Sequence, residues 1–165
     1  MGTKTIMVKL KRPSKRKHSM WVKEQNEYAK TVNKCVQRLS NGEKLSSKNV
    51  SSNLKYAIKN EAIRKAKKAI SDVKKGLAKS IPVFRNSIGI SINNQNWNTV
   101  CKNDRWYISF CTTEKKVTMP VIESGAVKTF FPYLIISKRE FRGTVQLIRK
   151  VRIGISLSRF RCFAI

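Results

Sequence analysis

The apolar residues near the N-terminus alternate with other residues, as they do along a half-buried β-strand. Ile6, Val8 and Leu10 fall on one face of an extended chain, and this spacing predicts a strand. Pro13 follows and ends the strand, because proline cannot donate a hydrogen bond to a sheet. Ser19 stands just before a helical pattern begins, so it is predicted to be the N-cap of a helix.

From Met20 onwards the apolar residues recur every three or four positions, which is the period of an amphipathic helix. The first stripe consists of Trp21, Tyr28, Val32, Cys35, Val36 and Leu39. Asn41-Gly42 is predicted to end this helix. A second helix is predicted to open at Leu45–Ser47 and to weaken at Gly76, and Pro82 forbids its continuation. The second stripe runs through Val50, Leu54, Ala57, Ile58, Ala62, Ile63, Ala66, Ala69, Ile70, Val73 and Leu77.

After Pro82 the pattern becomes that of short β-strands joined by turns. The segments predicted to be strands are Ser87–Ile92, Trp97–Cys101, Trp106–Phe110, Val117–Ile122 and Thr144–Ile148. Residues 130–136 are apolar but of ambiguous type. One strand, a helical block and an antiparallel meander together predict an α+β chain. Because the first strand can pair with the later ones, we expect the helices to be inserted in a small antiparallel β-barrel.

Charge is the strongest signal in the composition. The 165 residues include 36 Lys and Arg against 9 Asp and Glu, which gives a formal net charge of +27. Self-repulsion on this scale favours a polyanionic partner, with nucleic acid first and an anionic membrane surface second. It disfavours an enzyme that acts on a small neutral substrate. No window of 18 apolar residues occurs, so we expect no membrane-spanning helix. Because nucleic acid ranks first among polyanions, we expect it, and not a membrane, to be the partner.

Residue types used in catalysis and metal binding are few and scattered. The acidic residues show no spacing that predicts several carboxylates around one metal ion. His18 is the only histidine and lies in a basic segment, so serine and cysteine nucleophiles lack a general base. The four cysteines form no CxxC pair. We therefore expect no catalytic residue, no metal site and no cofactor in this chain.

Two clusters of basic residues are the candidate nucleic-acid-binding sites. The first cluster comprises Lys9, Lys11, Arg12, Lys15, Arg16 and Lys17. The second cluster, on the polar face of the second helix, comprises Arg64, Lys65, Lys67, Lys68, Lys74 and Lys75. Because so few acidic residues interrupt this face, we interpret it as a phosphate-binding surface. Trp97, Trp106 and Tyr107 can stack on bases, but their positions on alternating strands favour the core.

The order of several segments resembles the N-terminal part of the TnpB proteins, which are transposon-encoded, RNA-guided DNA nucleases. The segments are TIMVKLK, EYAKTVNKCVQRL with Tyr28 and Asn33, AIRKAKKAISDVKKG, SIPVFRNSIGISINNQNW, KKVTMPVI and GTVQLIRK. This resemblance covers residues 3–150 and implies a wedge-type β-barrel with an inserted recognition block. In that family the region binds guide RNA and the guide–target DNA duplex. The resemblance also implies a transposase-related cytoplasmic protein of a bacterium, phage or mobile element.

The nuclease of that family lies in a later RuvC-like domain with three acidic metal ligands and an inserted zinc ribbon. A full-length relative would therefore use Mg²⁺ and structural Zn²⁺, and we expect this chain to end before that domain. The resulting division has residues 1–12 as the first barrel strand and 13–81 as the helical block. Residues 82–150 form the rest of the barrel, and residues 151–165 are an aberrant tail.

Two explanations of that tail remain open. A frameshift near codon 150 would make residues 151–165 out-of-frame sequence, because the neighbouring frame can encode Glu-Asp-Trp-Tyr-Phe. Alternatively, Ile153–Ser158 is a decayed GIDLG strand with Ser156 at the first catalytic aspartate position, where a hydroxyl is a poor ligand for a hard cation. Both predict nucleic-acid binding without cleavage. The alternatives to a TnpB-like fragment are a nuclease-less RNA-guided regulator, a stand-alone ribosomal-type RNA-binding protein and a non-functional pseudogene product.

Overall fold

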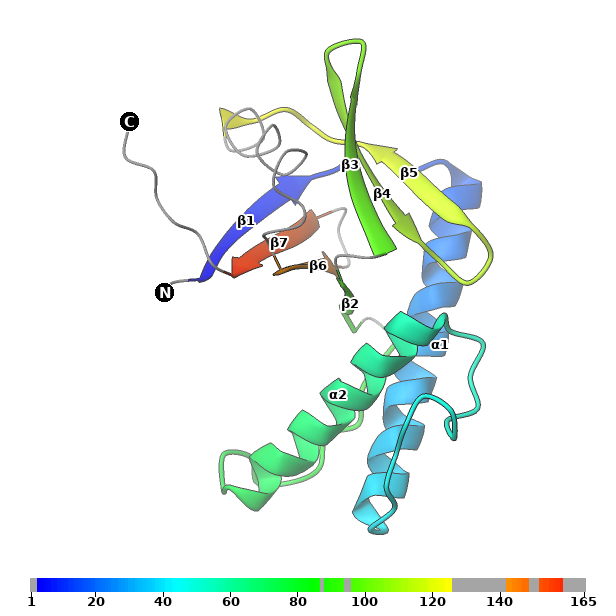
Figure 1. Cartoon of the computed structure of the whole chain (residues 1–165), viewed down its shortest axis with the longest axis vertical. Helices are drawn as coiled ribbons and strands as arrows, with labels where there is room; N and C mark the ends of the chain where they lie inside the picture. The colour runs from blue at the N-terminus through cyan, green and yellow to red at the C-terminus, as the bar shows by residue number, and fades with distance from the viewer. Residues whose placement is uncertain (1–2, 87, 94–95, 126–141, 149–151, 159–165) are drawn as a thin grey trace.

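The computed structural model describes residues 3–86, 88–93, 96–125, 142–148 and 152–158. Two helices and seven strands occur in this part of the chain, which confirms the predicted α+β class. Helix α2 and the later part of α1 pack together at one end of the molecule, and the first part of α1 runs beside the strands at the other end (Figure 1). The ambiguous segment at residues 130–136 lies outside the described residues.

Helix α1 spans Lys15–Ser40 and begins before the apolar pattern does. Its N-cap is Ser14, whose hydroxyl accepts a hydrogen bond from the backbone N of Lys17 at 3.4 Å. The prediction of Ser19 as the N-cap is therefore wrong. The first turn consists largely of basic residues, which have good helix propensity but show no apolar period. The helix ends as predicted, with Gly42 following at a φ of +82°.

Helix α2 spans Tyr56–Lys74, so the predicted helix start at Leu45–Ser47 is wrong. The segment between the helices forms turns that Glu27 of α1 holds in place. Its Oε1 accepts hydrogen bonds from the Ser52 hydroxyl and the Asn53 backbone N, each at 3.1 Å. Apolar side chains of these turns are buried, which explains why their spacing continued the stripe of the helix. These residues are Leu45, Val50 and Leu54.

Gly76 fixes the end of α2. Its φ of +70° places it in the left-handed region. The backbone N of Leu77 donates to the carbonyl of Asp72 at 2.8 Å, and that of Gly76 donates to the carbonyl of Val73 at 3.0 Å. This hydrogen-bond pattern is a Schellman motif. The helix therefore ends well before Pro82.

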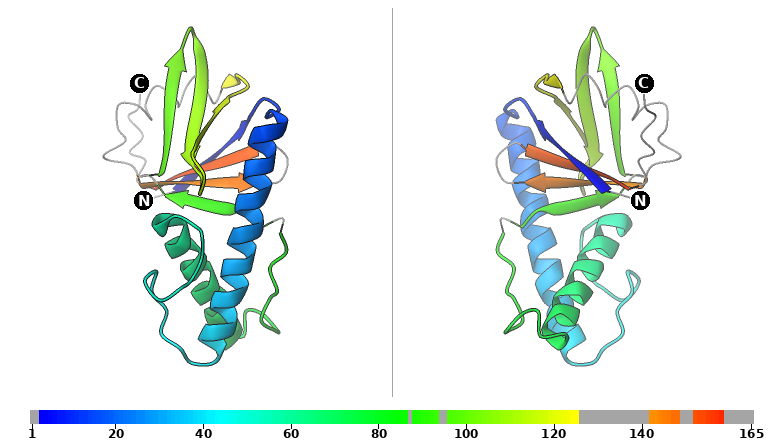
Figure 2. Two further views of the ribbon diagram at one scale, coloured as in Figure 1. Left: turned by 90° about the vertical axis from the view of Figure 1, so that its right-hand side faces the viewer. Right: turned by 90° about the vertical axis from the view of Figure 1, so that its left-hand side faces the viewer.

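The strands form two antiparallel sheets, in the orders β1–β7–β6–β2 and β3–β4–β5. Their bounds are β1 Thr3–Lys9, β2 Ile90–Asn93, β3 Trp97–Lys102, β4 Arg105–Cys111, β5 Lys116–Pro120, β6 Arg142–Ile148 and β7 Arg152–Ser158. Strand β1 thus pairs with a strand that follows the helices, which makes the helical block an insertion. Figure 2 shows that the strands of the two sheets run in crossing directions.

The two sheets meet just beyond the end of β1. Leu10 forms an isolated antiparallel bridge with Val121. The backbone N of Lys11 donates to the carbonyl of Pro120 at 2.9 Å, and the backbone N of Ile122 donates to the carbonyl of Lys9 at 2.8 Å. Strand pairing among the described residues links the sheets here without closing them into a barrel.

Residues 152–158, which the sequence assigned to an aberrant tail, form β7. Seven residue pairs join this strand to β1 and seven join it to β6. Ile153, Ile155 and Leu157 alternate with small residues, which is the pattern of a strand. The sheet therefore extends past residue 150, the boundary drawn from the sequence.

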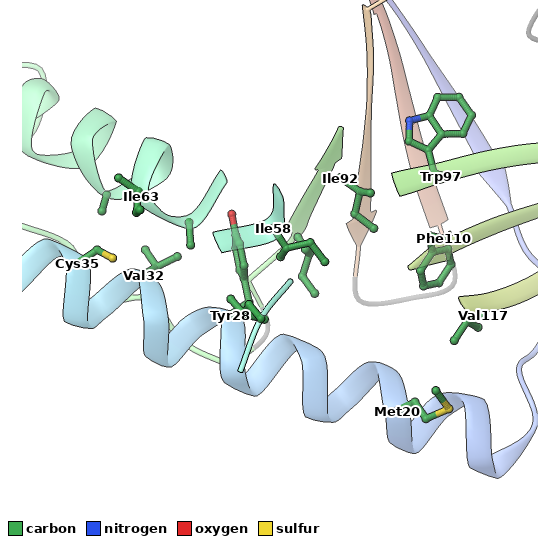
Figure 3. Close-up of a cluster of buried hydrophobic side chains, with 14 of the residues drawn as sticks. Met20, Tyr28, Val32, Cys35, Ile58, Ile63, Ile92, Trp97, Phe110 and Val117 are labelled. Carbon is green, nitrogen blue, oxygen red and sulfur yellow. The ribbon is translucent and has the colours of Figure 1, made fainter. Parts of the chain in front are cut away.

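One core runs along α1 and connects the helical end to the sheets. Tyr28, Val32 and Cys35 face Ile58 and Ile63 of α2 (Figure 3). Nearer the start of α1, its side chains meet the three-stranded sheet. The ring of Trp21 packs edge-on against Phe110, with 5.4 Å between ring centroids. Helix α1 thereby fixes both ends of the molecule relative to each other.

Candidate nucleic-acid interface

The first basic cluster surrounds the junction of β1 and α1. The backbone at Lys9 and Lys11 is hydrogen-bonded to the end of β5, while both side chains are exposed. Lys15 and Arg16 are exposed in the first turn of α1, which contains no acidic residue. Because the N-terminus of a helix carries partial positive charge, it favours anions and not further cations. This end of the molecule is therefore electrostatically suited to phosphate groups.

Two residues near this junction differ from their predicted roles. The Nζ of Lys17 donates to the carbonyl of Thr118 at 2.6 Å, so the side chain joins α1 to β5. His18 lies in α1 and not in a basic loop, and its side chain is exposed. Lys17 thus has a structural function that its sequence position did not reveal.

The second basic cluster lies along α2, where most of its members are exposed. The exposed residues are Arg64, Lys67, Lys68, Lys74 and Lys75. Arg64 is held by Glu61 of the preceding turn, with 2.7 Å between the guanidinium and the carboxylate. The other four have no ion pair within the described part of the chain.

Lys65 differs from the rest of this cluster because it is half-buried. Its Nζ lies 3.5 Å from the carbonyl of Gly89 and 5.8 Å from the centre of the Phe84 ring. Burial, followed by repulsion from Lys68, lowers the pKa of its ammonium group. Lys65 therefore joins α2 to the chain that leads into β2, and its half-buried ammonium group is less accessible to a ligand than those of its exposed neighbours.

The structure does not bring the two clusters together. Helix α1 has 26 residues and is therefore about 39 Å long. The first cluster lies at its N-terminus beside β5, whereas α2 descends to the opposite end of the molecule (Figure 1). A partner that contacts both clusters must extend along most of the long axis.

Most acidic residues of the described chain are already bound to donors of the protein. Glu24 is buried, and its Oε2 accepts hydrogen bonds from the backbone N and the hydroxyl of Thr113 at 2.8 and 2.7 Å. Four further carboxylates bind side chains or turns, namely Glu27, Glu43, Glu61 and Glu114. Among the described residues no three His, Cys, Asp or Glu side chains gather as a metal site.

The aromatic residues of the three-stranded sheet point to different faces. Trp97 is buried and Trp106 packs against the core, as expected. Tyr107 follows Trp106 and therefore faces the opposite side of β4. It is half-buried and lines a surface hollow, so its assignment to the core is wrong. Strand alternation was sufficient to predict that Trp106 and Tyr107 cannot both face the core.

Comparisons with models of known protein families and with curated protein sequences find no match for this chain. In the described residues, neither helix is long and apolar enough to cross a membrane.

Proposed function

We propose that this chain binds nucleic acid as the N-terminal part of a TnpB-like protein. In this proposal the two sheets are the halves of a wedge-type β-barrel, and α1 with α2 is the inserted recognition block. The guide RNA and its target DNA are the proposed ligands. The observation that carries the proposal is the placement of a strongly basic helical block between β1 and all other strands of the sheets.

Contacts between the segments that resemble TnpB support this assignment. Asn33 of α1 binds the backbone of Phe84 through both atoms of its amide. The Nδ2 donates to the carbonyl at 2.9 Å, and the Oδ1 accepts from the backbone N at 2.8 Å. Two motifs that are 51 residues apart in the sequence thus meet at one point. These hydrogen bonds hold the segment at Phe84, which leads from the helical block towards β2, against α1.

The proposed activity is binding without cleavage. Phosphate groups would be bound by exposed lysine and arginine side chains, which give affinity that is independent of sequence and sensitive to salt. The described residues contain no ligand set for the Mg²⁺ or the structural Zn²⁺ of a full-length relative. We therefore assign no catalytic step to these residues.

Salt-dependent binding of a fluorescently labelled RNA hairpin tests this proposal. Anisotropy titrations at several salt concentrations should give a steep linear fall of log K with log salt. The double variant Lys67→Glu/Lys68→Glu should weaken binding and reduce the slope by about 0.7–0.9 for each phosphate that the protein no longer neutralises. The control Lys44→Glu/Lys48→Glu changes the net charge equally, in the turns between the helices. A flat salt response, or equal weakening in both double variants, would contradict the proposal.

RNA that co-purifies with the protein separates the proposed function from its alternatives. One discrete RNA species supports guide binding by a TnpB-like fragment or a nuclease-less regulator. Ribosomal RNA instead supports a ribosomal-type protein. A chain that binds no nucleic acid despite being folded supports the pseudogene product.

A further inference from the structure

The outer face of the three-stranded sheet contains a hollow whose lining residues belong to neither basic cluster. Its volume is about 500 Å³, which is within the usual range for ligand-binding pockets. Side chains from all three strands line it, namely Val100 and Lys102 of β3, Tyr107 and Ser109 of β4, and Lys116 and Thr118 of β5. These residues share the sheet face that is turned away from the core.

The strand register places an aromatic ring between two cations. Tyr107 lies directly opposite Val100, and Lys102 is paired with Arg105 at the hairpin turn. Lys116 is paired with Cys111 at the other end of β4. Because a strand rises about 3.4 Å per residue, the two lysine backbones lie about 20 Å apart along the sheet. Tyr107 is between them, closer to Lys102.

The charges around the hollow favour an anionic ligand. Lys102 and Lys116 have no ion pair in the described part of the molecule. Arg105 adds a third exposed cation next to Lys102 on the same face of β4. The nearest acidic residues by sequence are Asp104, in the β3–β4 turn, and Glu114, which is paired with Lys23 at 3.3 Å. The cations therefore exceed the acidic groups at this surface.

We propose that this hollow binds a single-stranded segment of nucleic acid, with one unpaired base stacked on Tyr107 and flanking phosphates on Lys102 and Lys116. A half-buried aromatic ring offers its face to a flat base, and lysines on either side suit the backbone that continues in both directions. Thr118 is exposed and supplies a hydroxyl group that can bond the edge of the base or the sugar, whereas the Ser109 hydroxyl is buried and donates to the carbonyl of Asn98 at 3.4 Å. The inference rests on the proposed nucleic-acid binding but assigns it a separate site.

Selection of single strands follows from the position of the half-buried ring in the hollow. In a duplex each base is stacked between its neighbours, so it cannot reach a ring that lies within a hollow. Exposed lysines on a helix, in contrast, contact the phosphates of a duplex without disturbing it. The hollow and the α2 cluster should therefore discriminate between the two forms of nucleic acid.

Binding of two labelled probes tests the inference, namely an eight-nucleotide single strand without self-complementarity and a blunt-ended duplex. The substitution Tyr107→Ala should weaken single-strand binding about 5- to 150-fold and leave duplex binding unchanged. Tyr107→Phe should keep the affinity, because the ring remains. Tyr56→Ala is the matched control, since Tyr56 is an exposed tyrosine on α2. RNA and DNA versions of the single strand show whether the sugar hydroxyl contributes.

The outcomes separate this site from the proposed function. If the duplex binds with a steep salt dependence but Tyr107→Ala has no effect on the single strand, the hollow is not the site. If Tyr107→Ala weakens both probes equally, the residue has only a structural function and the inference is wrong. If neither probe binds the unaltered protein, both proposals fail. Photocrosslinking of a 5-iodouridine strand to Tyr107, mapped by mass spectrometry, would support the inference independently. It uses the unaltered protein, so the unfolding of a variant cannot explain the result.

Discussion

The substitution Asn33→Ala tests whether one amide joins the helical block to the sheet. Asn33 is partly buried on α1 and makes two hydrogen bonds to the backbone of Phe84. Each neutral hydrogen bond contributes about 0.5–1.5 kcal/mol, so the pair is worth about 1–3 kcal/mol. Alanine has a higher helix propensity than asparagine, which offsets up to about 0.7 kcal/mol of this loss in the free energy of unfolding. The observed decrease in the free energy of unfolding should therefore be somewhat below the full value of the pair.

Asn26→Ala is the matched control because Asn26 lies on the same helix and its side chain makes no hydrogen bond within the described part of the chain. Both variants gain the same helix propensity, so their difference isolates the two hydrogen bonds. Urea titrations followed by circular dichroism should show a lower midpoint for Asn33→Ala with an unchanged slope. The corresponding difference in Tm is about 2–12 °C. Equal midpoints for the two variants would refute the assignment of Asn33 as a structural joint.

Three further predictions concern other parts of the structure, and urea denaturation tests each of them. Glu24→Ala should cost about 2–4 kcal/mol because two donors of Thr113 lose a buried carboxylate, whereas Glu24→Gln keeps an acceptor and should cost less than about 1 kcal/mol. Burial, followed by the charge of Glu61, raises the pKa of the Tyr28 phenol, so the unfolded state loses its proton first. The free energy of unfolding should therefore fall as the pH rises above about 10. Tyr28→Phe should show a smaller decrease over the same pH range. An equal decrease in the variant and the unaltered protein would contradict this prediction. Ser14→Ala should destabilise α1 by about 0.5–1 kcal/mol, whereas Ser19→Ala should have no such effect; the reverse order would restore Ser19 as the N-cap.

Elements with a clear apolar period were predictable from the sequence. The alternation at Ile6, Val8 and Leu10 gave β1, and the stripe through Tyr28 and Val32 gave α1. Errors arose where buried apolar residues did not belong to a regular element. Leu54, for example, is buried between the helices next to Asn53, whose backbone Glu27 of α1 binds, and this contact between residues 26 positions apart has no local signature.

The candidate site was less predictable than the fold. Composition identified the basic residues but could not show which of them the fold uses. Lys17 donates to the backbone of β5, and Lys65 is half-buried beside Phe84. The division at residue 150 relied on resemblance to a longer family, and it did not anticipate that β7 would pair on both sides. Pairing between β1 and β7 depends on residues about 150 positions apart, which no local pattern encodes.

The distribution of acidic residues leaves much of the positive charge uncompensated within the described part of the chain. Glu24 and Glu27 bind hydroxyl and backbone N–H groups, and three further glutamates each pair with one basic side chain, so most exposed lysines have no acidic partner in the described part of the chain. Self-repulsion among those lysines is relieved when a polyanion binds, and a ligand that binds only the folded state also stabilises the fold. The basic faces suit duplex phosphates, while the hollow at Tyr107 suits an unpaired base. A folded RNA supplies both features in one molecule, whereas a plain DNA duplex supplies only the first. If the proposed function and the proposed base-binding hollow are both correct, a structured RNA is therefore the ligand expected to bind both surfaces.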